Sequence, residues 1–189
     1  MAAEYINRKG QAHYLKSVPT KKGKERYYIV KNKSKVKPDE LLLEVPRGFE
    51  FYEFPEDARV VIRKIPNSII NSEEMSIVDL VMKEHETAKD YILDKDENGI
   101  TVYLANLSKE DFNESEEHFK LIQSYTAKLR FEKARRNLYK AQRFCYLSQY
   151  YGWITMESSN DLGYLAEKYC YHIDKESLLD FWIEGEEDW

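Results

Sequence analysis

The feature that most constrains the fold of this chain is the repeated placement of turn-forming residues between short runs of strand-forming residues. Three pairs of such runs occupy residues 13–18 and 25–30, 49–54 and 59–65, and 91–93 and 100–104. Their connections contain Pro19 and Gly23, Pro55, and the dipeptide Asn98-Gly99. An Asn-Gly pair between strand-like runs is among the strongest local signals for a β-hairpin. The sequence therefore predicts antiparallel β-hairpins in both halves of the chain.

Two further short runs predict strands of their own. Residues 41–45 are mostly apolar and are followed by Pro46, which cannot donate to a β-ladder. Residues 153–156 are rich in side chains that favour strands.

Residues 127–148 fit two interpretations. One set of apolar residues keeps the four-and-three spacing that an α-helix would place on one face. Its members are Ala127, Phe131, Ala134, Leu138, Ala141 and Cys145. In the same segment Ala127, Leu129 and Phe131 alternate with charged residues, which is typical of a strand, and residues 135–137 offer a corner. We favour two strands and keep the helix as the alternative.

The hydrophobic period changes to that of a helix in two places. Asn71 and Glu74 have the spacing of a capping box, and the apolar residues that follow predict a helix over about 72–88. A second helix is predicted to begin near Asp161 and to end near His172, and Asp174 can cap a short further helix. The predicted fold is α+β, with antiparallel β-hairpins in both halves, one central helix and a helical C-terminus.

The polar, acidic segment 107–118 is the best candidate for a linker. It would separate a hairpin-rich α+β part, residues 1–106, from an aromatic-rich α+β part, residues 119–189. A single compact domain is the alternative, because the chain length suits one domain.

The C-terminal strings LYKAQRFCYL (138–147), WITME (153–157) and LGYLAEKYCYHI (162–173) resemble the C-terminal part of uncharacterised prokaryotic proteins with no assigned activity. In those proteins an aromatic-rich strand precedes a helix that ends in a Tyr-x-x-His pattern, here Tyr169 to His172. The resemblance implies a strand over 139–147 and implies no chemistry.

The sequence motifs that would indicate a metal site or a catalytic centre are incomplete or absent. Asp94, Asp96, Asn98 and Gly99 match the opening of a calcium-binding EF-hand loop, but the twelfth position is Ala105 instead of glutamate. Cys145, Cys170 and His172 are too few for a structural zinc site. Neither a phosphate-binding glycine loop nor a nucleophile elbow is present. We therefore predict no catalytic residue, metal or cofactor, and an enzyme of unrecognised chemistry remains an alternative.

The compartment is predicted from what the chain does not contain. Two cysteines are too few for a disulfide framework, and no apolar run approaches the length of a membrane span. We expect a cytoplasmic protein with no membrane partner.

Positive charge is concentrated at the start of the chain. Residues 1–37 hold eleven Lys or Arg against two acids, a net charge of +9, whereas the whole chain carries −5. A second basic cluster runs from Lys128 to Arg143, with a net charge of +6. Lysine and arginine bind phosphates, and aromatic rings stack on unpaired bases. The alternative is that these bases only solvate strand edges or pair with the protein's own acids.

These patterns lead to two functional hypotheses. The first is a non-catalytic module that binds RNA, single-stranded DNA or another polyanion through Lys21, Lys22, Lys24, Arg26, Tyr27, Tyr28, Arg130, Arg135 and Arg136. The second is a protein–protein interaction or assembly subunit, with a protein partner or a second copy of the chain. Its surface would be formed by Tyr150, Tyr151, Trp153, Tyr171 and Trp182.

Overall fold

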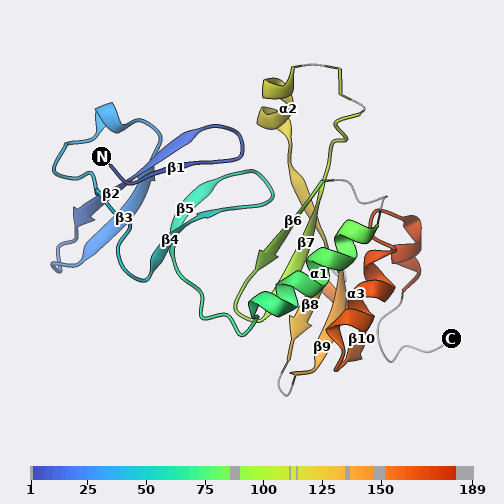
Figure 1. Ribbon diagram of the computed structural model, residues 1–189. Helices are drawn as coiled ribbons and strands as arrows, with labels where there is room; N and C mark the ends of the chain where they lie inside the picture. The colour runs from blue at the N-terminus through green and yellow to red at the C-terminus, as the bar shows by residue number, and fades with distance from the viewer. Residues whose placement is uncertain are drawn as a thin grey trace. The chain divides into compact units, whose positions relative to one another are not determined.

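The chain consists of two compact units. The computed structural model describes residues 2–85, 90–110, 112–113, 115–134, 137–146 and 152–181 (Figure 1). Unit 1 comprises Met1–Ile65 and Lys109–Ser124, and unit 2 comprises Pro66–Ser108 and Tyr125–Trp189. Both units are built from antiparallel strands, and the predicted α+β fold is confirmed. Among the described residues, no helix combines the length and apolarity that crossing a bilayer requires.

Unit 1 contains a three-stranded and a two-stranded antiparallel sheet. The three-stranded sheet has the order β1 (Glu4–Ile6), β2 (Ala12–Pro19), β3 (Glu25–Val30), and the other pairs β4 (Phe49–Glu53) with β5 (Val60–Lys64). The hairpins β2–β3 and β4–β5 are the two that the turn residues predict. The short strand β1 was not predicted.

The predicted strand over 41–45 is wrong. After β3 the chain forms a short 3-10 helix, η1 (Lys33–Lys35), and then makes an isolated bridge from Leu41 to Lys16. The carbonyl of Leu42 accepts the N–H of Ala3, and strand β1 begins one residue later. Strand β1 pairs with residues 12–14 of β2, which is the part of the β2 edge that residues 43–45 would need. Residues 43–45 therefore do not pair with β2.

The segment 109–124 of unit 1 contains helix α2 (Glu116–Ile122), which the sequence did not predict. The hydroxyl of Ser115 accepts the N–H of His118 and so caps its first turn. The ring of Phe112 lies against those of His118 and Phe119.

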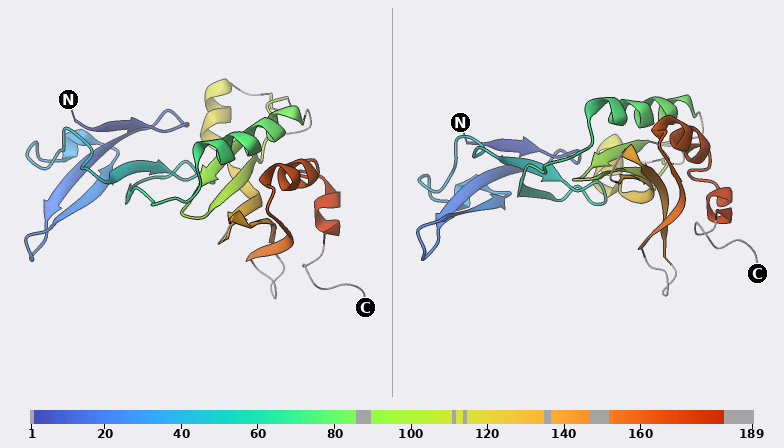
Figure 2. Two further views of the ribbon diagram at one scale, coloured as in Figure 1. Left: turned by 60° about the horizontal axis from the view of Figure 1, so that its bottom comes forward. Right: turned by 90° about the horizontal axis from the view of Figure 1, so that it is seen from below.

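Unit 2 is a five-stranded antiparallel sheet with two helices on one face (Figures 1 and 2). The strand order is β10 (Gly152–Ser159), β9 (Tyr139–Cys145), β8 (Tyr125–Lys133), β7 (Gly99–Ala105), β6 (Tyr91–Lys95). Helices α1 (Ser72–Glu84) and α3 (Leu162–Cys170) pack against each other, and α3 also contacts β8, β9 and β10.

Strands β8 and β9 settle the two interpretations of 127–148 in favour of strands. Leu129 and Phe131 alternate with charged neighbours, and both are fully buried in the core beneath the helices. Asn137, with φ 58°, turns the chain between the two strands. Asparagine tolerates this left-handed conformation better than most residues.

The capping box of α1 is confirmed. The side chain of Asn71 accepts the N–H of Glu74 at 2.8 Å, and the Glu74 carboxylate accepts the N–H of Asn71 at 2.7 Å. The helix ends at Glu84, and residues 86–89, which include the end of the predicted range, lie outside the described part of the chain.

The helical C-terminus is confirmed by α3 and by the 3-10 helix η3 (Glu176–Asp180), but the predicted cap of the latter is wrong. Lys175 holds the N-cap position and makes no capping hydrogen bond through its side chain. Asp174 has a left-handed backbone, with φ 64°, whereas an N-cap residue needs an extended one.

Candidate nucleic-acid interface

The β2–β3 hairpin places basic and aromatic side chains on one face of its sheet. Lys16 lies opposite Tyr28, and Val18 lies opposite Arg26. Directly opposed residues in antiparallel strands point to the same side, and residues two apart on one strand share that side. Lys16, Arg26 and Tyr28 therefore lie on a single face.

The tip of this hairpin exposes three further lysines. The carbonyl of Thr20 accepts the N–H of Gly23 at 2.9 Å, and its hydroxyl accepts the N–H of Lys24 at 3.1 Å. Gly23 has φ 74°, a conformation that glycine adopts without steric cost. The side chains of Lys21, Lys22 and Lys24 are all exposed around this closed turn.

The two predicted tyrosines lie in different environments. Tyr28 is 41% exposed, and the amine of Lys16 lies 6.0 Å from the centre of its ring. Tyr27 points to the opposite face, where its ring meets that of Phe49 edge-on at 5.0 Å. Tyr28 is thus available to a ligand, whereas Tyr27 contributes to the packing of β3 against the β4–β5 hairpin.

A further cation joins the same face from η1. The amine of Lys33 lies 5.1 Å from the ring centre of Tyr14, which is two residues before Lys16 on β2. We refer to these side chains together as the basic hairpin surface. It consists of Lys16, Lys21, Lys22, Lys24, Arg26, Tyr28 and Lys33.

Most of the N-terminal bases form no ion pair with the acids in the described part of the chain. Among the eleven Lys and Arg of residues 1–37, nine form no ion pair with any residue that the structure describes. The exceptions are Arg8, which contacts Glu53 at 2.8 Å, and Lys16, which contacts Glu40 at 3.3 Å. The basic hairpin surface therefore retains most of its positive charge.

The second basic cluster is in unit 2, and most of its described bases have partners there. Arg130 contacts Asp96 at 2.7 Å and donates to the side chain of Asn98 at 3.0 Å. Lys133 contacts Glu74 at 2.6 Å, and the side chains of both residues are largely buried. Arg135 and Arg136 lie outside the described residues. Arg130 therefore does not belong to the basic hairpin surface.

The motif that opens like an EF-hand forms a polar hairpin turn. One carboxylate oxygen of Asp96 accepts the N–H groups of Asn98 and Gly99, at 3.0 and 2.8 Å, and the other contacts Arg130. Both oxygens of Asp96 are thus occupied within the protein. In the described parts of the chain, no three His, Cys, Asp or Glu side chains gather in the manner of a metal site.

The aromatic residues of the C-terminal half are only partly described. Trp153 is half-buried, and its ring meets that of Phe144 edge-on at 5.1 Å. Tyr171 is 53% exposed, with the amine of Lys175 lying 3.3 Å from its ring centre. The other three residues of the predicted aromatic surface, Tyr150, Tyr151 and Trp182, lie outside the described residues.

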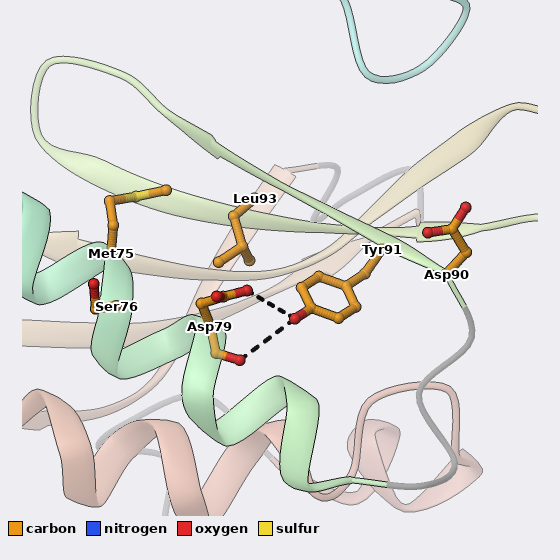
Figure 3. Close-up of a pocket in the computed structure, with 6 residues that line it drawn as sticks. All are labelled: Met75, Ser76, Asp79, Asp90, Tyr91 and Leu93. Carbon is orange, nitrogen blue, oxygen red and sulfur yellow. Dashed lines mark hydrogen bonds between the residues drawn. The ribbon is translucent and has the colours of Figure 1, made fainter. Parts of the chain in front are cut away.

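A cavity of about 480 Å³ lies between α1 and β6 (Figure 3). It is lined by Met75, Ser76, Asp79, Asp90, Tyr91 and Leu93.

The acidic side chains of this cavity have hydrogen-bond partners within the protein. The Tyr91 hydroxyl donates to Asp79 at 2.8 Å, and burial together with this hydrogen bond raises the pKa of Tyr91. Hydrogen bonds from Lys83 and Tyr91 lower the pKa of Asp79. Asp90 accepts a hydrogen bond from Tyr125. Both carboxylates that line the cavity therefore accept a hydrogen bond from a tyrosine hydroxyl of the protein.

The fold and this surface define an α+β protein whose N-terminal unit presents a basic hairpin with one exposed tyrosine. Comparison with protein-family models, curated protein sequences and solved structures gave no match to this chain.

Proposed function

We propose that the protein binds single-stranded nucleic acid, RNA or DNA, through the basic hairpin surface of unit 1. The observation that carries this proposal is the exposed ring of Tyr28 beside Lys16 and on the same face as Arg26. An exposed ring among cations is the combination that binds an unpaired base together with its flanking phosphates.

The charge of the surface supports the same proposal. The tip lysines and Arg26 make no ion pair with a described residue, so a phosphate does not have to displace an internal carboxylate. Each phosphate that is neutralised releases counterions, which makes the affinity strongly salt-dependent. The acidic remainder of the chain, with −14 over residues 38–189, would repel nucleic acid elsewhere and favour binding at this surface.

A single strand fits this surface better than a duplex. In a duplex the bases are stacked on each other and do not offer a face to a tyrosine ring, whereas a single strand does. The surface also has no long helix to enter a major groove, since β2, β3 and the short 3-10 helix η1 build it.

Fluorescence anisotropy tests the proposal with labelled single-stranded RNA, single-stranded DNA and duplex DNA of equal length, at several salt concentrations. The test variant is Lys21→Glu/Lys22→Glu/Lys24→Glu, which reverses the three exposed charges of the hairpin tip. The matched control is Lys9→Glu/Arg47→Glu/Lys64→Glu, because these bases belong to the same unit and also lack ion pairs with described residues. Both variants change the net charge equally.

The expected result is salt-sensitive binding of the single strands that is lost in the tip variant and mostly retained in the control. The slope of log affinity against log salt should fall by about 0.7 for each phosphate contact removed, or about 2 for all three. No binding of any of the three nucleic acids at low salt would refute the proposal. Equal losses in the two variants would also refute it, because they would show an effect of net charge alone.

The alternative proposal is an assembly function of the C-terminal aromatic residues, which the exposure of Tyr171 supports. Sedimentation velocity of the full chain at low and high salt separates the two proposals. A defined oligomer that persists at high salt and is lost in Tyr171→Ser would favour assembly.

A further inference from the structure

A second cavity, of about 320 Å³, lies in unit 2 between strands β8 and β9 and the segment that contains η3. It is lined by Ala127, Lys128, Arg143, Phe144, Tyr146, Asp174, Lys175, Glu176, Leu178 and Leu179. Its volume is at the lower end of the range that small-molecule sites occupy.

The charged residues of this cavity differ in exposure according to their sign. Lys128, Arg143 and Lys175 are half-buried, whereas Asp174 and Glu176 are exposed. A charge that is partly removed from water interacts more strongly with a ligand than one that water surrounds. The lining of the cavity therefore has a net positive charge, with three cations against two acids, and the acids are its more exposed charges.

Two of these cations are available to a ligand. The Nε atom of Arg143 donates to the carbonyl of Phe181 at 3.0 Å, which fixes the guanidinium, and its terminal nitrogens form no ion pair with a residue that the structure describes. Lys128 forms no ion pair with a residue that the structure describes. A carboxylate accepts hydrogen bonds from both kinds of group, and from arginine in a bidentate manner.

The rest of the lining is apolar and leaves room for a hydrocarbon group. Leu178 is buried, Phe144 is half-buried, and Ala127 contributes only a methyl group. Tyr146 and Leu179 are 58% and 63% exposed and add solvent-facing apolar surface to the lining. Burial of a ring or branched chain here would add hydrophobic free energy to the ionic contacts.

We propose that this cavity binds a small organic monoanion, a carboxylate that carries an aromatic or branched apolar group. The carboxylate contacts Arg143 and Lys128, and the apolar group lies against Phe144 and Leu178. The two acids of the lining, Asp174 and Glu176, disfavour a second negative charge on the ligand. This site belongs to unit 2 and is independent of the basic hairpin surface of unit 1.

Three probes of one shape test the proposal: 3-phenylpropionate, its neutral amide 3-phenylpropionamide, and the cationic 3-phenylpropylamine. Binding to the full chain is followed by backbone NMR shifts of residues 127–129 and 142–144. The acid should bind with a Kd of about 1 mM or tighter, and the amide and the amine should bind at least tenfold more weakly. Because the lysine variants of unit 1 leave this cavity intact, they should not change the result.

Lys128→Gln should weaken binding of the acid about tenfold, since it removes a charge-assisted hydrogen bond. Ala127→Leu should abolish binding by filling the cavity. The control is Lys140→Gln on β9, because Lys140 contacts Glu132 and does not line the cavity. Circular dichroism confirms that each variant is folded.

The proposal is overturned by any of three results. The first is that the backbone NMR shifts do not change when the acid is added at ten times the expected Kd. The second is that the amide or the amine binds as tightly as the acid. The third is that Lys128→Gln and Lys140→Gln have equal effects on binding of the acid.

Discussion

Glu74 of helix α1 accepts a hydrogen bond from the hydroxyl of Tyr139 in strand β9, and the two residues are 65 positions apart in the sequence. The same carboxylate contacts the amine of Lys133 in β8 at 2.6 Å and accepts the N–H of Asn71 at the start of its own helix. Glu74 is only 5% exposed. One buried carboxylate therefore holds the first turn of α1 against two strands of the sheet.

The first prediction concerns the pH dependence of this cluster. Burial raises the pKa of Glu74, but the hydrogen bonds from Lys133, Tyr139 and Asn71 outweigh it and hold the pKa below its ordinary value. A lowered pKa stabilises the fold above the pKa of the unfolded chain, and this stability is lost as the pH falls through the folded value. Glu74→Gln should cost about 2–3 kcal/mol at pH 7 and clearly less at pH 3.5. Urea unfolding at both pH values measures this, and a cost independent of pH would contradict it.

The second prediction concerns the other end of the pH scale. Burial, the hydrogen bond to Glu74 and the negative charge of Glu74 raise the pKa of Tyr139 to about 12. The neutral hydroxyl therefore stabilises the fold fully below pH 10, and this contribution is lost as the pH rises towards 12. Tyr139→Phe should cost about 1 kcal/mol at pH 7 and should reduce the alkaline loss of stability. Unfolding curves between pH 8 and pH 11.5 measure both effects, and an unchanged alkaline slope would argue against this assignment.

The third prediction concerns Gly99, which lies close to Arg130. A Cβ atom at this position would be 2.8 Å from a terminal nitrogen of the Arg130 guanidinium, which is held by Asp96 and Asn98. Gly99→Ala should therefore displace the guanidinium and destabilise the protein by about 1–2 kcal/mol.

A double-mutant cycle identifies the cause of that loss. In an Arg130→Ala background, Gly99→Ala should cost less than about 0.5 kcal/mol, because the clash is gone and alanine restricts the unfolded chain. An equal cost in both backgrounds would show that the guanidinium is not responsible.

The fourth prediction concerns the reactivity of the two cysteines. Cys145 and Cys170 are both buried, and burial raises the pKa of the Cys170 thiol to about 12. Only about one Cys170 side chain in ten thousand is then a thiolate at pH 8. Ellman's reagent should react with both thiols when the protein is unfolded in urea. Over the same time it should react with neither thiol in the folded protein. Rapid labelling of Cys170 in the folded state would mean that the packing around α3 opens frequently.

The fifth prediction separates stacking from charge at the proposed interface. Tyr28→Ala should weaken binding of single-stranded RNA by about tenfold, whereas Tyr28→Phe should retain most of the affinity. Neither change should alter the thermal unfolding midpoint greatly, because the ring is 41% exposed. Tyr171→Ala, which removes another exposed tyrosine, is the control in the anisotropy measurement. If Tyr28→Ala binds as tightly as the control, Tyr28 does not stack on a base.

The hairpins could be predicted because their turns carry local signals. Gly23 and the Asn98-Gly99 pair each fix a chain reversal within a few residues, and the structure has a hairpin at both places. The strand over 41–45 failed for a non-local reason, since strand β1, far away in the sequence, occupies the edge that this run would need. Apolar composition alone does not report whether a partner strand is free.

The candidate site shows the same division between local and long-range information. Alternation along β3 predicts that Tyr27 and Tyr28 point to opposite faces, but it does not say which face is covered. The β4–β5 hairpin covers the Tyr27 face through Phe49 and leaves Tyr28 exposed. The contact of Arg130 with Asp96 likewise spans neighbouring strands and a turn, so charge counting along the sequence could not reveal it.

The strand order of unit 2 has a consequence for how this unit folds. From β6 to β10, each strand of the sheet pairs with its neighbours in chain order, so most pairings join segments that follow one another along the chain. Such local pairings have a small loop-closure cost and are associated with fast folding. The contact between α1, which precedes all five strands, and α3, which follows them, joins segments from the two ends of this order. We expect this helix pair to dock after the transition state, so that substitutions between the helices accelerate unfolding and leave the folding rate nearly unchanged.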